Sequence, residues 1–256
     1  MKKLYIGSMK RFSGKNIFTL GLALDLKEKG YQIGYIKPVG KSPINHEGET
    51  VDADALFFAE TLCLKEAVTT LSPFVFTFDT IHSALSGRMK GPGEEILSAI
   101  KSIKGKDVLL IAGTTDIFEG SIFGINGISI VKNTDSRALV VESWKDEDTI
   151  NGILGAREIF AEDLLGVVIN EVREELVDFM TKNVVPYLKS KGIDVFGIIP
   201  TDPLLRAVSV ATLTGILGGK VLCAEDRLDE MVEHFSIGAM EVNNAHKFYH
   251  MSLTTT

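Results

Sequence analysis

The sequence "GSMKRFSGKN", residues 7–16, decides the fold of this chain. It follows a short apolar run, "KLYIG" (3–7), and precedes "NIFTLGLALDLKEKG" (16–30), which has helical spacing and ends at a glycine. A glycine-containing turn between a buried strand and a helix is a common phosphate-binding arrangement, because backbone N–H groups and the positive helix end face the anion. The stretch therefore predicts a strand, a phosphate-binding loop and a helix. An ordinary strand–helix turn is the alternative.

The composition of this loop supports the first interpretation. Small residues allow successive backbone N–H groups to turn inward around phosphate oxygens, and a lysine at the helix start, Lys15, supplies a cation. Position 16 is Asn, where such loops carry the Ser or Thr that holds Mg²⁺. We expect the nucleotide-binding loop to consist of Gly7, Ser8, Met9, Lys10, Arg11, Phe12, Ser13, Gly14, Lys15, Asn16 and Ile17.

Strand and helix patterns alternate along the chain to about residue 200. Continuous apolar runs predict strands at 3–7, 31–40, 107–113, 137–143, 164–170 and 193–200. Helical spacing predicts helices at 16–30, 51–64, 93–105, 146–160 and 175–192. This order predicts an α/β fold, a doubly wound, mostly parallel sheet with helices on both faces. The loops at 7–16, 37–50, 113–120 and 170–173 should meet beyond the carboxyl ends of the strands, where such sheets bind ligands.

Composition excludes several classes of function. The chain of 256 residues has a formal net charge of −7, which does not provide the broad basic surface of a nucleic-acid-binding protein. No apolar run approaches the ~20 residues that span a bilayer, and the amino terminus lacks a signal-peptide core. We therefore expect a cytoplasmic protein without nucleic-acid or membrane partners. Cys63 and Cys223 lack metal-ligand spacing and are expected to be free, buried thiols.

Several motifs occur in the order found in a known family. They are the "SGK" loop, "YIKPVG" (35–40), "DADAL" (52–56), "VLLIAG" (108–113) and the pair "GVVINEV" and "GIIPTDPLL". In this order the chain resembles the dethiobiotin synthetase-like P-loop proteins. It resembles in particular the amino-terminal, BioD-like domain of long phosphate acetyltransferases and related proteins with a DRTGG module. The resemblance covers nearly the whole chain and implies binding of ATP or ADP.

The resemblance also implies roles for individual residues. Lys15 matches the phosphate-binding lysine, and Lys37 matches the lysine between the phosphates and the reacting amine; both would be catalytic in an active enzyme. Asp54 matches a metal-ligating aspartate, although Asp52 competes for that role, and either acid could instead stabilise a helix N-terminus. Asn170 and Pro200 match residues that border the adenine base.

Two departures from the family concern the metal. Asn16 replaces the hydroxyl residue, and Ala112 replaces a metal-ligating glutamate. The candidate metal ligands are therefore Asn16 and Asp54. Loss of an oxygen ligand weakens the binding of a hard cation, so the resemblance implies Mg²⁺ binding that is weakened. Asp116 and Glu119 follow a few residues later and could compensate.

The carboxyl-terminal part forms a separate prediction. The pattern over 218–248 predicts a strand, a helix, a short strand and a helix, and it resembles the opening half of a DRTGG-type module. We therefore expect a dethiobiotin synthetase-like P-loop domain over 1–215 and a partial small α/β module over 216–256. An incomplete sheet exposes an edge that can pair with another chain, so a homodimer is one expectation.

Three classes of function follow from these motifs. The favoured one is a nucleotide-binding regulatory or sensory protein with a degenerate metal site. The second is an active Mg-ATP-dependent carboxylase or ligase of the dethiobiotin synthetase or cobyrinate synthase type. The third is a structural partner domain that binds no nucleotide.

Overall fold

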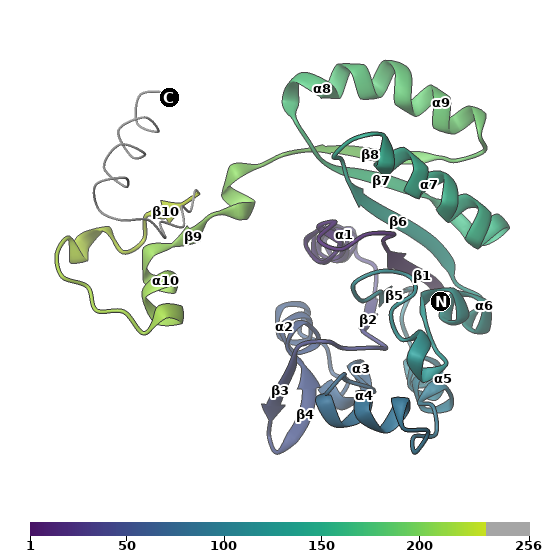
Figure 1. Cartoon of the computed structure of the whole chain (residues 1–256), viewed down its shortest axis with the longest axis horizontal. Helices are drawn as coiled ribbons and strands as arrows, with labels where there is room; N and C mark the ends of the chain where they lie inside the picture. Colours follow the sequence, from purple (N-terminus) through teal and green to yellow (C-terminus); the bar gives the residue numbers. More distant parts are fainter. Residues whose placement is uncertain (234–256) are drawn as a thin grey trace. The chain divides into compact units, whose positions relative to one another are not determined.

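The structure, a computed structural model of the chain, describes residues 1–233. The chain divides into two compact units, Met1–Thr201 and Asp202–Thr256, and each is considered by itself (Figure 1). The first unit ends one residue after the last strand of the large sheet. The domain boundary at 215/216 stays a prediction.

The first unit is built on a six-stranded sheet in the order β2-β5-β1-β6-β7-β8. Every neighbouring pair of strands is parallel, and β1 lies between β5 and β6, with Tyr5 opposite Ile111 and Ala138. This arrangement confirms the predicted doubly wound α/β fold. The strands are β1 (Lys2–Gly7), β2 (Ile33–Ile36), β5 (Val108–Ala112), β6 (Arg137–Ser143), β7 (Leu164–Val172) and β8 (Val195–Pro200).

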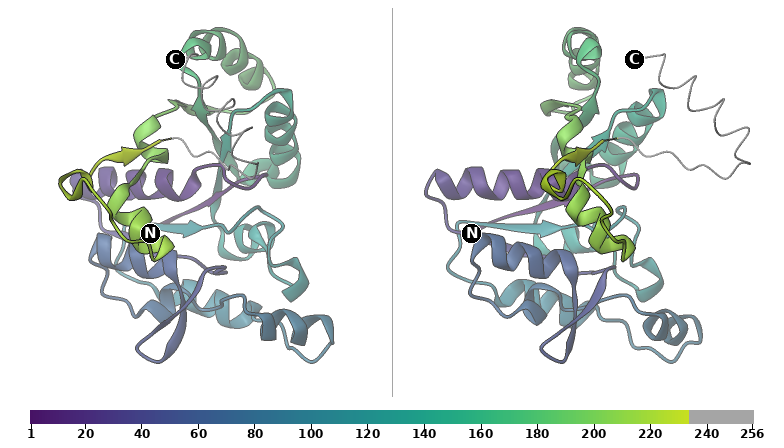
Figure 2. Two further views of the ribbon diagram at one scale, coloured as in Figure 1. Left: turned by 60° about the vertical axis from the view of Figure 1, so that its left-hand side comes forward. Right: turned by 90° about the vertical axis from the view of Figure 1, so that its left-hand side faces the viewer.

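Helices cover both faces of the sheet, as the views in Figure 2 show. Successive side chains of a strand point to opposite faces, so Tyr5 belongs to one buried cluster and Ile6 to the other. The Ile6 cluster packs against α1 (Lys15–Glu28) and α2 (Ala53–Leu62). The Tyr5 cluster packs against α5 (Gly93–Ser102), α6 (Gly127–Thr134), α7 (Glu147–Phe160), α8 (Glu174–Phe179) and α9 (Val185–Ser190).

A hairpin that the sequence pattern did not predict lies before α2. Its strands are β3 (Pro43–His46) and β4 (Glu49–Asp52), which pair in antiparallel fashion. The predicted helix at 51–64 begins later, at Ala53, because Asp52 is extended and caps the helix by accepting from the N–H groups of Asp54 and Ala55. The short helices α3 (Val68–Leu71) and α4 (Phe78–Leu85) were not predicted either.

Tyr5 lies in the centre of the sheet, under the start of α6. Its side chain is 1% exposed, and burial, followed by the charge of Asp116, raises the pKa of its hydroxyl above the usual value. A β-carbon on Gly127 would lie 2.0 Å from the Tyr5 hydroxyl oxygen. Position 127 therefore has no space for a side chain, and glycine there allows α6 to approach β1.

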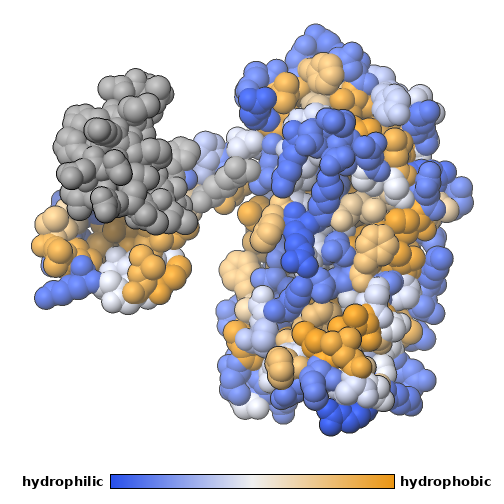
Figure 3. Space-filling view, viewed as in Figure 1, coloured by the Kyte–Doolittle hydropathy of each residue, from blue (hydrophilic) through white to orange (hydrophobic). Residues whose placement is uncertain are grey.

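The second unit contains the two-stranded antiparallel sheet β9 (Val208–Ser209) and β10 (Met231–Val232) and the helix α10 (Val210–Leu217). Hydrophobic residues gather on its surface (Figure 3), and those with exposed side chains include Leu204, Leu205, Ile216, Leu217 and Leu222. In residues 1–233, neither α10 nor any other helix is long and apolar enough to cross a membrane.

The strand predicted directly after Gly218 is wrong. Residues 219–224 are irregular, and Leu222 is 88% exposed, so the described residues provide no surface on which this run is buried. The described residues after this run form a short 3₁₀ turn (Glu225–Arg227) and the strand β10, and the elements predicted beyond residue 233 lie outside the described residues.

The expected burial of the two cysteines is also wrong. Cys63 and Cys223 are free thiols, and both are exposed. Cys63 is the C-cap residue of α2, in a left-handed conformation with φ of 51°. The apolar pattern around Cys63 reflects the burial of its neighbours, such as Leu62, and not of the cysteine itself.

Candidate functional site

A cavity of about 580 Å³ lies where the loops after β1, β2 and β5 meet the last residues of β7. The sequence predicted that the stretches 7–16, 37–50, 113–120 and 170–173 gather beyond the carboxyl ends of the strands, and each of them contributes lining residues; Asp54 comes from α2. They are Arg11, Phe12, Ser13, Gly14, Lys15, Asn16, Ile17, Lys37, Lys41, Ser42, Asp54, Gly113, Thr114, Thr115 and Glu171.

The loop between β1 and α1 turns at Gly14, which has a φ of 78°. A side chain is strained in this conformation, and a β-carbon at position 14 would also lie 2.1 Å from the Asn170 amide nitrogen. Gly14 precedes α1, whose first turn carries no side-chain cap. The backbone N–H groups of such a turn have no partner within the helix, so they are available to an anion.

Lys15 is the first residue of α1, and only 9% of it is exposed. Its ammonium donates to the carbonyl of Thr115 at 3.1 Å, from the loop after β5. Desolvation, together with the nearby positive charge of Lys37, lowers the pKa of Lys15 to about 8. The Lys15 ammonium is therefore held at the cavity by a neutral carbonyl group. A buried ammonium with a lowered pKa favours the binding of an anion beside it.

Residues 8–10 of the loop are held by hydrogen bonds to the protein interior and do not line the cavity. The buried Ser8 hydroxyl lies 2.8 Å from the Lys10 carbonyl and 3.1 Å from that of Thr115, and Met9 N–H donates to the Glu142 carboxylate. Glu142 is 1% exposed. Burial raises its pKa to about 7, against the opposing effects of the Met9 and Lys10 N–H groups and of the charges of Lys10 and Lys15.

The four predicted loop residues that do not line the cavity are accordingly Gly7, Ser8, Met9 and Lys10. Gly7 ends β1, and the exposed ammonium of Lys10 lies 3.8 Å from the carboxylate of Asp148 on α7. Phe12, at the opposite extreme, is 89% exposed and has a φ of 57°.

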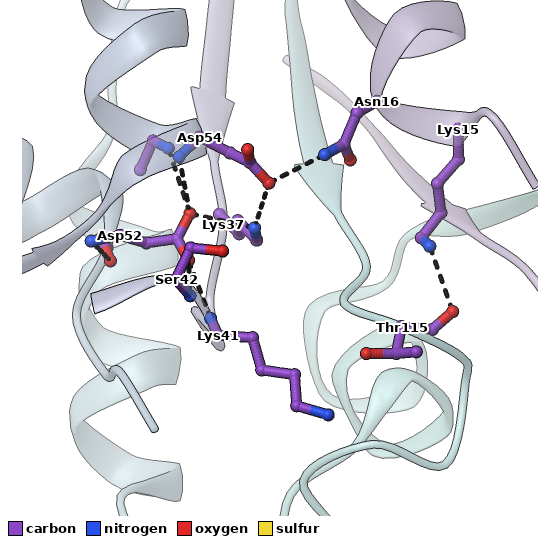
Figure 4. Close-up of polar contacts among 10 residues, drawn as sticks. Lys15, Asn16, Lys37, Lys41, Ser42, Asp52, Asp54 and Thr115 are labelled. Carbon is purple, nitrogen blue, oxygen red and sulfur yellow. Dashed lines mark hydrogen bonds and ion pairs between the residues drawn. The ribbon is translucent and has the colours of Figure 1, made fainter. Parts of the chain in front are cut away.

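A cluster of charged groups forms the other side of the cavity (Figure 4). The Lys37 ammonium lies 2.9 Å from Asp52 Oδ1 and 2.5 Å from Asp54 Oδ2. Asp52 is completely buried, and its carboxylate also accepts from the N–H groups of Lys41 and Ser42 at 2.7 and 2.9 Å. Asp52 therefore joins β4, α2 and the loop after β2, and it holds Lys37 at the edge of the cavity.

The two predicted metal ligands contact each other in this cluster. Asn16 Nδ2 donates to Asp54 Oδ2 at 2.8 Å, the same oxygen that receives the Lys37 ammonium. Ala112, which replaces the family's metal-ligating glutamate, is 4% exposed, and its side chain has no oxygen that could bind a metal. An oxygen that already accepts from two donors, one of them charged, does not fit a divalent cation. In residues 1–233, no three His, Cys, Asp or Glu side chains form a group that could hold a metal ion.

The two acids that could compensate for Ala112 have other contacts. Asp116 accepts from the N–H groups of Phe118 and Glu119 and so caps the turn after β5. The carboxylate of Glu119 pairs with Lys41 at 3.0 Å.

The predicted base-binding residues lie at the ends of β7 and β8. Asn170 Nδ2 donates to the Ser13 carbonyl at 3.0 Å, so this side chain contacts the phosphate loop. Pro200 is exposed at the end of β8, where it pairs with Val172. Neither Asn170 nor Pro200 is among the residues that line the cavity. Their role in binding a base stays a prediction. Glu171, which does line the cavity, has a φ of 56° and accepts from the Ser143 hydroxyl.

Sequence reasoning missed several residues of this site. Glu142 carried a signal, since it is the one acid in the apolar strand "RALVVES" and a buried strand tolerates an acid only with partners. Lys41 and Ser42 directly follow the "YIKPVG" motif. Thr114, Thr115 and Glu171 lie in the stretches 113–120 and 170–173 that were predicted to reach the ligand-binding edge, but no motif assigned a role to any of them.

The sheet order and the loop between β1 and α1 define a P-loop protein of the α/β class. A family model described as "AAA domain" (AAA_26) matches residues 2–209. The chain belongs to this family.

Curated relatives agree with this assignment. The phosphate acetyltransferase of Pseudomonas putida is 25% identical over 264 residues, a match that covers 95% of this chain and 36% of the enzyme. The chain thus spans about a third of the length of this relative. The ATP-dependent dethiobiotin synthetase BioD of Caldicellulosiruptor saccharolyticus is 36% identical over 76 residues, covering 30% of this chain and 31% of the enzyme. These matches bear out the BioD-like P-loop family that the motif order indicated.

Among solved structures, the MinD cell division protein of Aquifex aeolicus aligns with 80% of this chain and 84% of its own. The sequences are 18% identical and the TM-score is 0.48. At this level of similarity the fold rests on the strand order and not on the alignment.

Proposed function

We propose that this chain binds ATP or ADP, with the phosphates at the loop of residues 7–17, and that it acts as a regulatory or sensory protein. The observation that carries the proposal is that the Lys15 ammonium and the uncapped first turn of α1 are next to the same cavity. A cation and unpaired N–H groups at one point form a site for an anion.

Two further features support an anion as the ligand. The Ser13 hydroxyl is buried, and among the described residues it has no hydrogen-bond partner. A buried polar group without a partner is costly, and a phosphate oxygen would satisfy it. The cavity is also lined by the cations Arg11, Lys37 and Lys41, which match the charge of a polyphosphate.

The regulatory part of the proposal rests on the metal side of the site. Phosphoryl transfer relies on a metal that neutralises charge developing on the phosphates. The residues that would hold it, Asn16, Asp54 and Ala112, do not present a set of free oxygen ligands. Ground-state binding through N–H groups and Lys15 does not require that metal. The acetyltransferase and synthetase activities that are named for the relatives are therefore not carried over to this chain.

Calorimetry of ADP binding tests the proposal. The matched variants are Lys15→Ala and Lys132→Ala, the second at an exposed position on α6. Because hydrogen bonds to charged groups contribute about 1.5–3 kcal/mol, Lys15→Ala should weaken ADP by about 10-fold or more, and Lys132→Ala should not. Absence of ADP and ATP binding by the parent protein would favour a structural partner domain.

Turnover separates the regulatory proposal from the ligase alternative. ATP hydrolysis, and dethiobiotin formation from diaminopelargonate, should be very slow or absent. A rate on the order of 1 s⁻¹ or more is that of an ordinary enzyme, and it would restore the ligase.

A further inference from the structure

The side of the cavity that contains the predicted metal ligands, Asn16 and Asp54, also contains a cation of the protein itself, the Lys37 ammonium. The Lys37 ammonium lies between the carboxylates of Asp52 and Asp54, at 2.9 and 2.5 Å, and its side chain is 6% exposed. Lys37 also lines the cavity, so its charge lies beside the place that the loop of residues 7–17 offers to phosphates. Figure 4 shows that Lys37 and Asn16 approach the same oxygen of Asp54 from two elements.

The orientation of the Asn16 amide follows from its neighbour. An ionised carboxylate only accepts hydrogen bonds, so the atom of Asn16 that lies 2.8 Å from Asp54 Oδ2 is the NH₂ group. A Thr or Ser at this position would offer a hydroxyl oxygen to a cation. Asn16 instead donates to Asp54, and it occupies the carboxylate that a metal would use.

In this chain, where Asn16 also donates to Asp54 and Ala112 supplies no carboxylate, the position of Lys37 opposes a second cation at the same oxygen. Mg²⁺ binds carboxylate oxygens at about 2.0–2.1 Å, and a magnesium ion on Asp54 Oδ2 would therefore lie beside the ammonium that is 2.5 Å from that atom. Two like charges at such a distance repel each other strongly in a partly buried site. Asp52 holds Lys37 in place, since it is itself fixed by the N–H groups of Lys41 and Ser42.

We propose that the Lys37 ammonium takes the place of the divalent cation, so that this chain binds nucleotide phosphates without a metal. In this arrangement Asn16 and Asp52 are positioning residues: Asn16 keeps Asp54 directed at Lys37, and Asp52 holds the ammonium at the cavity. The inference rests on the proposed nucleotide binding and goes beyond it, because it identifies the charge that faces the phosphates.

The first experiment measures ADP and ATP affinity of the parent protein in excess Mg²⁺ and in EDTA. The expected affinities differ by less than about twofold. Binding that is tenfold or more tighter with Mg²⁺ would overturn the inference and leave the proposed function intact. No binding under either condition would instead refute the proposed function, so the two failures are distinguishable.

The second experiment uses Lys37→Ala, with Lys41→Ala as the matched control. Lys37→Ala leaves Asp52 and Asp54 without their cation, so in EDTA the affinity for ADP should fall at least tenfold, and Mg²⁺ should restore part of it. Lys41 also lines the cavity but pairs with Glu119, so Lys41→Ala should lower the affinity equally with and without Mg²⁺. The same loss in Lys37→Ala under both conditions would contradict a metal-like role.

A third variant covers the case in which Lys37→Ala does not fold. The side chain of Asp54 is 36% exposed, so Asp54→Asn should remain folded. If Lys37 is the cation of the site, Asp54→Asn removes a negative charge near the phosphates, and ADP should bind more tightly in EDTA, with no further gain from Mg²⁺. A loss of affinity of tenfold or more that appears with Mg²⁺ but not in EDTA would show that the carboxylate holds a metal, and would overturn the inference.

Discussion

The side-chain amide of Asn170 donates to the main-chain carbonyl of Ser13, with an Nδ2–O distance of 3.0 Å. The two residues are 157 positions apart, and their contact links the end of β7 to the loop before α1. The next residue, Gly14, passes so close to the amide that it has no space for a β-carbon. The shape of the loop is therefore set partly by a distant strand.

Asn170→Ala should weaken inorganic sulfate and ADP by a similar factor. The variant removes one hydrogen bond to the loop, a contribution of about 1 kcal/mol, which corresponds to about fivefold in affinity. Calorimetry with both ligands measures it, and the control is Asn183→Ala, at an exposed position where the amide donates to the Phe179 carbonyl, away from the cavity. If ADP is weakened far more than sulfate, Asn170 contacts the base, as the sequence indicated.

Gly14→Ala should destabilise the protein and abolish measurable ADP binding. The φ of 78° and the approach of 2.1 Å to Asn170 together force a shift of the loop, and a strained residue of this kind costs about 1–3 kcal/mol. Urea unfolding and calorimetry measure the two effects. The control is Gly21→Ala in α1, where a β-carbon would have open space and which should stabilise the helix by about 0.5–1 kcal/mol. Equal behaviour of the two variants would disprove the role of Gly14.

The sheet could be predicted from the sequence because its strands are buried on both faces. Such strands are continuous apolar runs, and β6 at 137–143 was predicted with the bounds that the structure has. The hairpin β3–β4 could not be predicted in this way, since β3 is exposed or half-buried over Pro43–His46 and has no apolar run. Helix α6 was missed although Asn126 and Ser129 form a capping box, because only eight residues follow its cap.

From the residues alone, the site could be predicted only where it is local. The residues from Arg11 to Ile17 follow one another along the loop and the first turn of α1, and the sequence indicated them directly. Lys37 and Asp54, which also line the cavity, were indicated by the family resemblance. The role of Asp52 depends on contacts with Lys37, Lys41 and Ser42, which come from another element. No spacing rule connects those positions, so an acid at a helix start could be a cap, a metal ligand or, as found, a cap that also holds a lysine.

Glu142→Gln should change how ADP affinity depends on pH. Phosphate near the loop disfavours a charged Glu142, so binding favours the protonated form, and the parent affinity should fall as the pH rises through about 7, the pKa that burial gives this carboxyl. Lys15 contributes in the same direction, because loss of its proton near pH 8 removes a cation. The glutamine still accepts from Met9 N–H but carries no charge, so the decrease near pH 7 should disappear while the one near pH 8 remains.

Calorimetry from pH 6 to pH 9 tests this prediction. The titration of the nucleotide itself is common to both proteins and cancels when they are compared. Identical pH profiles would show that Glu142 is not charged at neutral pH or does not affect the ligand.

Asp52→Ala should destabilise the fold strongly. The variant removes the acceptor of four backbone N–H groups, at Lys41, Ser42, Asp54 and Ala55, and leaves the buried Lys37 without one of its two partners. Breaking a buried pair costs about 3–5 kcal/mol. Urea unfolding should show a loss of this size, whereas Asp54→Ala, at a partly exposed position, should lose less. A loss below about 1 kcal/mol for Asp52→Ala would contradict its central role.

The contact between Tyr5 and Gly127 has a consequence for how this family can diverge. A β-carbon at position 127 would also lie 2.6 Å from Cζ of the Tyr5 ring, so it becomes acceptable only when a smaller side chain replaces the ring, and the two positions should vary together in an alignment of relatives. A relative with alanine at 127 should carry a residue smaller than phenylalanine at 5. In an experiment, Tyr5→Leu should therefore restore part of the stability that Gly127→Ala loses, so that the effect of one substitution depends on the other.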